Sequence, residues 1–146
     1  MLRGSYQAKM DDKGRLKVPT PFRRFIEAQY GLGVYVTSMK GDCVKIYPLP
    51  EWEKMEQKIA LLPSMSPARR KFLETTSYYG QQSELDAQGR VLISPLLRRA
   101  AGVTADVSVM GSLTYLTVWK LETFEQRIVD DPYTDEDEAI IAALGI

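Results

Sequence analysis

Apolar positions follow two different periods along this chain, and together they predict strands and helices in a recurring order. Short apolar runs joined by glycine-containing turns predict two pairs of strands, at residues 34–38 and 43–47 and at residues 107–110 and 115–119. Apolar residues at helical spacing predict a short helix before each pair, ending at Gly31 and at Gly102. With a strand before each helix, the outline β-α-β-β occurs twice.

Hydroxyl residues followed by proline mark the start of each short helix, as expected of an N-cap with proline at the first helical position. Thr20-Pro21 and Ser94-Pro95 supply these pairs, with Thr20 and Ser94 as the expected N-caps. Residues 50–62 and 66–77 predict two connecting helices, and Thr134 is expected to cap a final helix with an acidic first turn.

An internal repeat is the strongest feature of the sequence. Residues 11–18 (Asp-Asp-Lys-Gly-Arg-Leu-Lys-Val) return 75 positions later as residues 86–93 (Asp-Ala-Gln-Gly-Arg-Val-Leu-Ile). At this offset the capping prolines sit one position apart, so the two helix starts are expected to be similar and not superimposable. In the repeat alignment, Arg23 and Arg24 correspond to Arg98 and Arg99. The safer interpretation of these arginine pairs is a solvated or carboxylate-paired helix face.

The repeated motif predicts a β-hairpin at the start of each copy. A three-residue turn with a bulge needs one residue at positive φ, and Gly14 and Gly89 occupy that position, which makes both glycines structural. The motif's aspartate and arginine should flank each loop. These flanking pairs are Asp11 with Arg15 and Asp86 with Arg90.

The chain of 146 residues has an ordinary globular composition, with 45% hydrophobic and 26% charged residues. It contains no histidine, which removes the commonest general base and metal ligand. Cys43 is the single cysteine, expected to be a small buried residue. These absences disfavour an enzyme, and we expect no catalytic residue, no metal and no cofactor. No apolar run suggests a membrane span or a secretory signal, so a cytoplasmic location is expected.

The net charge of zero hides opposite charges at the two ends of the sequence. Residues 1–24 hold seven Lys or Arg against two Asp, a net charge of +5, whereas residues 121–146 hold eight Asp or Glu against one Arg, a net charge of −7. A basic segment of this kind suits a polyanionic partner.

The predicted fold class is α+β, mainly β. Each copy is too short to bury a large core alone, so we expect the two copies to interleave in one pseudo-two-fold β barrel with peripheral helices. The predicted division of the chain is a first copy at residues 5–50, a helical connector at 51–80, a second copy at 81–124 and an acidic helical tail at 125–146.

The doubled motif resembles the MraZ family of bacterial regulators, as do residues 3–6 (Arg-Gly-Ser-Tyr) and residues 46–52 (Ile-Tyr-Pro-Leu-Pro-Glu-Trp). The tandem copies also resemble the swapped-hairpin dimers of the broader AbrB and SpoVT regulators. The resemblance implies a nucleoid-associated transcriptional regulator of its own cell division and cell wall operon. Such a protein binds short direct repeats in double-stranded promoter DNA as a homo-oligomer, in the form of a ring.

Basic residues at the first hairpin are the candidate DNA contacts. Arg15 is the expected base-reading residue, with Asp11 as its orienting partner, because its planar fork can bond a guanine edge bidentately. The alternative is that Arg15 only pairs with Asp11 and locks the turn. The supporting candidates are Lys13, Lys17, Arg3 and Arg90. Trp52, Tyr47 and Trp119 are expected to be core or subunit-contact residues.

Two other functions remain open at this point. AbrB-like folds also serve as antitoxins, so a duplicated barrel could grip a partner protein without any promoter preference. An enzyme is the third possibility, but no assembled catalytic constellation is visible.

Overall fold

The computed structural model describes all 146 residues in eight strands and six helices. The strands are β1 (Ser5–Lys9), β2 (Arg15–Lys17), β3 (Gly33–Thr37), β4 (Val44–Pro48), β5 (Gln81–Glu84), β6 (Arg90–Leu92), β7 (Asp106–Gly111) and β8 (Leu116–Lys120). The helices are α1 (Thr20–Tyr30), α2 (Leu49–Ile59), α3 (Pro67–Tyr78), α4 (Pro95–Ala101), α5 (Leu121–Asp130) and α6 (Asp135–Ala142). This arrangement confirms the α+β class with a mainly β body. None of the helices combines the length and apolar character needed to span a bilayer.

The two halves of the chain exchange strands in a six-stranded antiparallel sheet of order β1-β7-β8-β4-β3-β5. β1 of the first half pairs with β7 of the second, and β5 of the second half pairs with β3 of the first. β4 and β8 meet in the middle of the sheet. β2 and β6 form a separate two-stranded sheet. Every strand pairing except β3 with β4 and β7 with β8 therefore joins one half to the other.

The expected closed barrel is not found, because β1 and β5 each pair on one side only and leave the large sheet with two edges. The expected hairpins are also opened out. A single bridge between Met10 and Leu16 links the arms of the first hairpin, and β1 and β2 then enter different sheets. The second hairpin is opened in the same way, since β5 enters the large sheet and β6 pairs with β2.

The helix starts differ from the prediction at one point. The N-cap of α1 is Pro19 and not Thr20, which is already the first helical residue. Ser94 caps α4 as predicted, and its side chain accepts a hydrogen bond from the N–H of Leu97 at 3.3 Å. Pro19 and Ser94 are 75 positions apart, so the two helix starts coincide in the repeat, contrary to expectation. The ring of Pro19 fixes φ near the value a helix start accepts, which accounts for the earlier start.

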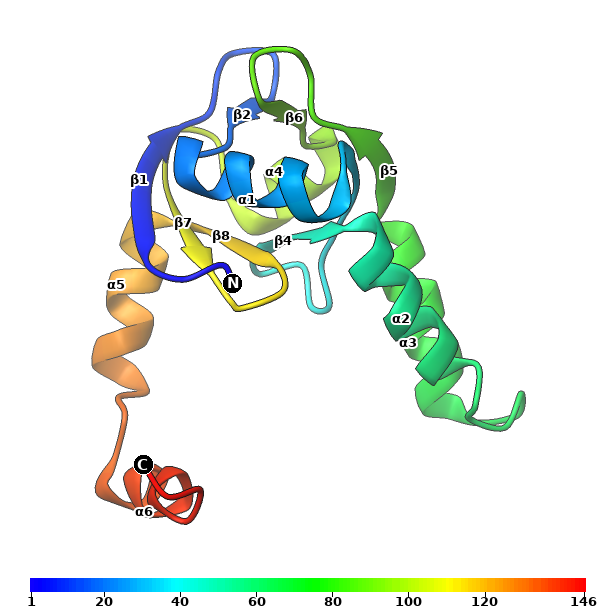
Figure 1. The fold of residues 1–146 in the computed structure, drawn as a ribbon, viewed down its shortest axis with the longest axis vertical. Helices are drawn as coiled ribbons and strands as arrows, with labels where there is room; N and C mark the ends of the chain where they lie inside the picture. Colours follow the sequence, from blue (N-terminus) through cyan, green and yellow to red (C-terminus); the bar gives the residue numbers. More distant parts are fainter.

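The hydrophobic core fills the space between the two sheets, together with α1 and α4 (Figure 1). Leu16 of β2 faces Val91 of β6 directly, and both side chains are buried. Ile26 of α1 and Leu97 of α4 are completely buried in the same cluster. Residues from both halves thus share one core.

Two helical arms extend from the outer face of the large sheet, at opposite ends of it (Figure 1). The α2–α3 arm packs through Trp52, whose ring lies 4.6 Å from that of Tyr35 and 6.0 Å from that of Phe72. The second arm, α5 with α6, begins beside Trp119, whose ring lies 5.9 Å from Phe124. Both tryptophans and Tyr47 are buried, which confirms their predicted structural role. α5 was not predicted as a separate helix, and it follows β8 as α2 follows β4.

We predict that Leu16→Ala lowers the free energy of unfolding by about 2–5 kcal/mol, because it leaves a cavity where the two halves meet. Urea unfolding measures this loss. Leu92→Ala is the matched control, since Leu92 lies opposite Arg15 in the same small sheet but is exposed. Equal losses for the two variants would contradict the alternation of buried and exposed residues along β2 and β6.

Candidate nucleic-acid interface

The two copies of the motif lie side by side at one end of the molecule (Figure 1). We call residues 11–15 loop 1 and residues 86–90 loop 2. The carbonyl of Gly14 accepts a hydrogen bond from the N–H of Ile93, and the carbonyl of Gly89 accepts one from the N–H of Val18, both at 2.9 Å. Each loop is therefore held by the backbone of the other half, and the two form one paired tip.

Asp11 organises loop 1 through three hydrogen bonds. Its Oδ1 accepts from the N–H of Arg15 at 2.7 Å and from the N–H of Lys13 at 3.0 Å, and its Oδ2 accepts from Nε of Arg15 at 2.8 Å. Asp86 makes the same set with Arg90 and Gln88. The aspartate and arginine thus flank each loop as predicted.

These bonds favour the charged form of both aspartates. The backbone N–H of Arg15, followed by its side chain and the N–H of Lys13, lowers the pKa of Asp11 below its usual value. The backbone N–H of Arg90 leads the same effect on the pKa of Asp86. Each loop therefore holds a carboxylate that stays ionised well into the acidic range.

The pairing with aspartate uses only the Nε–H of each motif arginine and leaves both terminal amino groups of the guanidinium without a partner. Asp11 takes Nε of Arg15, whereas Nη1 and Nη2 of Arg15 donate no hydrogen bond within the chain. The same is true of Arg90 beside Asp86. The two side chains are 32% and 28% exposed, so the unused donors are accessible. Locking the turn and binding an external acceptor are compatible roles for one arginine.

Arginines from the two short helices support the loops from below. Arg98 of α4 lies so close to Gly14 that a Cβ there would sit 2.3 Å from its Cζ, and its Nε donates to the carbonyl of Ile93 at 2.9 Å. Arg23 of α1 lies equally close to Gly89, and its Nη2 donates to the carbonyl of Ala87 at 3.1 Å. Each loop is thus supported by an arginine of the other half.

Sequence reasoning missed this role of Arg23 and Arg98. Arg23 does carry the expected carboxylate partner, Glu27, at 3.0 Å, but Arg98 has none. The available signal was the exact match of the two arginines at the 75-residue offset, together with the two glycines. Both glycines have positive φ as predicted, 80° for Gly14 and 73° for Gly89, and the absence of a side chain also lets the arginines approach.

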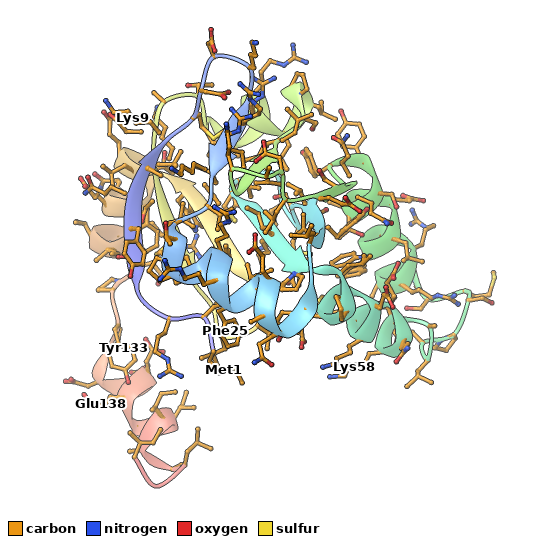
Figure 2. All side chains as sticks on the ribbon, turned by 45° about the horizontal axis from the view of Figure 1, so that its top comes forward. Met1, Lys9, Phe25, Lys58, Tyr133 and Glu138 are labelled. Carbon is orange, nitrogen blue, oxygen red and sulfur yellow. The ribbon has the colours of Figure 1, made fainter.

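The remaining basic candidates fall into two places. Lys13 at the tip and Lys17 on β2 are exposed and form no ion pair, and Lys17 shares an open groove with Lys9, which we had not predicted. Arg3 lies apart from them. It precedes β1, whose five residues span about 16 Å, so it sits near Met1 and away from the loops (Figure 2).

Cys43 is buried as predicted, and burial raises the pKa of its thiol to about 12. A thiol with so high a pKa carries almost no thiolate at neutral pH, so it is a poor nucleophile. Cys43 is a buried residue immediately before β4.

A family model described as "MraZ protein, putative antitoxin-like" matches residues 1–75 and 80–139. The chain belongs to the MraZ family. The resemblance seen in the doubled motif is therefore confirmed, and the match to the MraZ model covers both loops and most of both arms.

Proteins named transcriptional regulator MraZ are similar to this chain along its whole length. The MraZ of Acidobacterium capsulatum is 49% identical and that of Koribacter versatilis 48% identical, each covering all of both chains. The MraZ of Citrobacter koseri is 35% identical over 99% of this chain and 95% of its own. These MraZ relatives are named as regulators and not as enzymes.

We predict that Asp11→Asn lowers the Tm at neutral pH and that this effect disappears in acid. Because the folded-state pKa of Asp11 lies below 3.8, its contribution to stability is present above that pH and is lost as the pH falls through the lowered value. Thermal unfolding of the wild-type protein and of Asp11→Asn between pH 2.5 and 7 measures the difference in Tm. Asp12→Asn is the control, since Asp12 is exposed and makes no hydrogen bond. A constant difference in Tm across the range would contradict the prediction.

We also predict that Gly14→Ala destabilises the MraZ fold more than Gly102→Ala. Both glycines have positive φ, so each substitution costs about 1–2 kcal/mol of backbone strain, but a Cβ at Gly102 would meet only the side chain of Lys120, at an ordinary contact distance of 3.5 Å. At Gly14, Arg98 must also swing away and lose its bond to Ile93, which adds about 1 kcal/mol. Urea unfolding measures both losses. The extra cost should vanish in an Arg98→Ala background; its persistence there would show that Arg98 is not the cause.

Proposed function

We propose that this chain is a DNA-binding transcriptional regulator that contacts double-stranded DNA through loops 1 and 2. The observation that carries the proposal is the pairing of the loops into one tip with unused guanidinium donors on Arg15 and Arg90. The names of the relatives support the regulatory role.

Arg15 is the proposed base-reading residue. Asp11 holds its Nε edge, so the plane of the guanidinium is oriented and both Nη donors remain for a guanine edge in the major groove. A bidentate contact of this kind distinguishes bases by roughly 1–3 kcal/mol. Lys13 and Lys17 would bind phosphates and fix the position of the tip.

Loop 2 is the weaker contact in this proposal. Arg90 repeats the geometry of Arg15, but Ala87 and Gln88 stand where loop 1 has Asp12 and Lys13. Arg90 is therefore a supporting contact. Arg3 is left out of the contact set because it lies at the far end of β1.

The strand exchange between the halves supports a swapped-hairpin origin of the fold. We propose that residues 5–50 and 81–124 are two SpoVT/AbrB-like copies, with residues 51–80 as connector and 125–146 as tail. The pairing of β1 with β7, β5 with β3 and β2 with β6 is what a swap of the two opening hairpins would produce.

Binding by one subunit should be weak, which favours an oligomer on repeated sites. Around the tip, six cations (Lys13, Arg15, Lys17, Arg23, Arg90 and Arg98) face four carboxylates (Asp11, Asp12, Asp86 and Glu27), a net charge of only +2. Several linked subunits on short direct repeats would raise the affinity by avidity. We therefore propose a ring-shaped homo-oligomer in the cytoplasm, at the nucleoid, acting on the promoter of its own cell division and cell wall operon.

A protein-binding, antitoxin-type module is the second candidate, and the description of the family model favours it. A module of this kind is expected to bind promoter DNA no better than other DNA. The same DNA-binding experiment therefore separates the two functions.

We predict that a labelled fragment from upstream of the chain's own gene binds more tightly than a scrambled fragment in fluorescence anisotropy. Arg15→Ala should abolish the preference, a loss of about 5–150-fold for the native fragment, since one bidentate base contact is removed. Lys17→Ala should weaken the binding of both fragments to the same extent. It should also reduce the slope of log affinity against log salt by about 0.9, the value for one phosphate contact.

Arg24→Ala is the control, because Arg24 is exposed on α1 and forms no hydrogen bond or ion pair with either loop. Equal and weak binding of both fragments, unchanged by Arg15→Ala, would refute loop 1 as the reader. That result would favour the protein-binding module.

A further inference from the structure

A cavity of about 420 Å³ lies on the outer face of the large sheet, between the turn that joins β3 to β4 and the turn that joins β7 to β8. Both turns are at the end of the body opposite loops 1 and 2 (Figure 1). Lys45 of β4 and Thr117 of β8 are direct partners in the sheet at this place. Their neighbours along each strand fill the core, so these two side chains point to the outer face. The volume falls within the usual range of small-molecule sites, about 300–1,000 Å³.

Three cations line this cavity, and none of them has a carboxylate partner in the chain. They are Lys40, Lys45 and Arg127. Asp42 is the only acidic residue of the lining, which leaves the cavity with a net charge of +2. A concave site with an excess of unpaired cations favours an anionic ligand.

Aromatic rings hold two of these cations in position. Nζ of Lys45 lies 5.4 Å from the centre of the Tyr115 ring, and that ring stacks on the buried Tyr47 at 4.5 Å. Cζ of Arg127 lies 5.0 Å from the centre of the Trp119 ring. A ring face attracts the charge but does not take up the conventional hydrogen-bond donors, so the N–H groups of both cations stay available to a ligand.

A pair of hydroxyl groups adds a further donor. Oγ of Ser112 and Oγ1 of Thr117 lie 3.2 Å apart and share a hydrogen bond. That bond uses one of the two hydroxyl hydrogens, so the other hydrogen remains to be donated to a ligand. Donors therefore reach the cavity from β4 through Lys45, from β8 through Thr117 and from α5 through Arg127.

We propose that this cavity binds a small phosphomonoester. Three phosphate oxygens in a tetrahedral arrangement can accept from donors that approach from different directions, whereas a carboxylate offers two oxygens in one plane. The net charge of +2 in the lining matches the charge of such a group at neutral pH, about −1.5 to −2. Met39, Met110 and Trp119 supply the apolar part of the lining, which suits the organic body of the ligand.

The phosphomonoester site is separate from the proposed DNA contact, because it lies at the other end of the body. The repeat supplies no second copy of it. Met55 stands 72 positions before Arg127, at the equivalent place on the helix that follows β4. Failure of the phosphomonoester site would therefore leave the DNA proposal intact, and failure of the DNA proposal would leave this site intact.

Titration calorimetry of the full chain without DNA tests the site, with glycerol 3-phosphate as the probe. The pH is about 7.5, above the second phosphate pKa of about 6, so the probe is a dianion. We expect a Kd below about 1 mM for glycerol 3-phosphate. Succinate, a dicarboxylate of similar size, should bind about 10-fold more weakly, and glycerol should not bind. Lys45→Gln and Arg127→Gln should each weaken binding of the probe by about 10–150-fold, the effect of losing one hydrogen bond to a charged group.

Lys120→Gln is the matched control, since Lys120 is an exposed cation next to Trp119 that does not line the cavity, and it should keep the wild-type affinity. Arg15→Ala should also keep it. Loss of binding in Arg15→Ala, with normal binding in the two cavity variants, would place the phosphate at loop 1 and overturn the proposal. No binding of glycerol 3-phosphate, equal binding of succinate, or an unchanged affinity in Lys45→Gln or Arg127→Gln would each overturn it as well.

Discussion

The pairing of β2 with β6 is the interaction on which the rest of the structure depends. Only three residues of each strand take part, with Leu16 and Val91 buried at the centre. This short ladder brings two segments 75 residues apart into contact, and it sets both loops beside each other. It also places the helices that follow, so that each helix reaches under the loop of the other half. Without it neither half would have a closed core.

Local features of this fold could be predicted from the sequence with good accuracy. The repeat, both short helices, the connecting helices and the positive φ of Gly14 and Gly89 all follow from spacing and turn chemistry. The Asp11–Arg15 pair is of the same kind, because its two residues flank one tight loop. Such features depend on neighbours within a few positions along the chain.

Pairings between distant segments could not be predicted, because hydrophobic periodicity does not say which strand lies beside which. The separation of β1 from β2 and the open edges of the large sheet belong to this group. The position of Arg98 beside Gly14 could not be predicted either. The sequence does not distinguish a helical arginine that faces water from one that contacts a loop. Helix α5 was missed although Leu121, Phe124 and Ile128 recur at helical spacing, so the sequence did carry a signal for it.

The unequal loops give the molecule a direction. A symmetric dimer of identical hairpins presents the same side chains on both sides of its axis and so reads inverted repeats. Duplication within one chain removed that restriction, and Lys13 now stands opposite Gln88. In the proposed DNA complex, a subunit with two different loops would read a sequence that has a direction, and the subunits of the proposed ring would all face the same way around it. Their binding sites would then follow one another along the DNA in a single orientation.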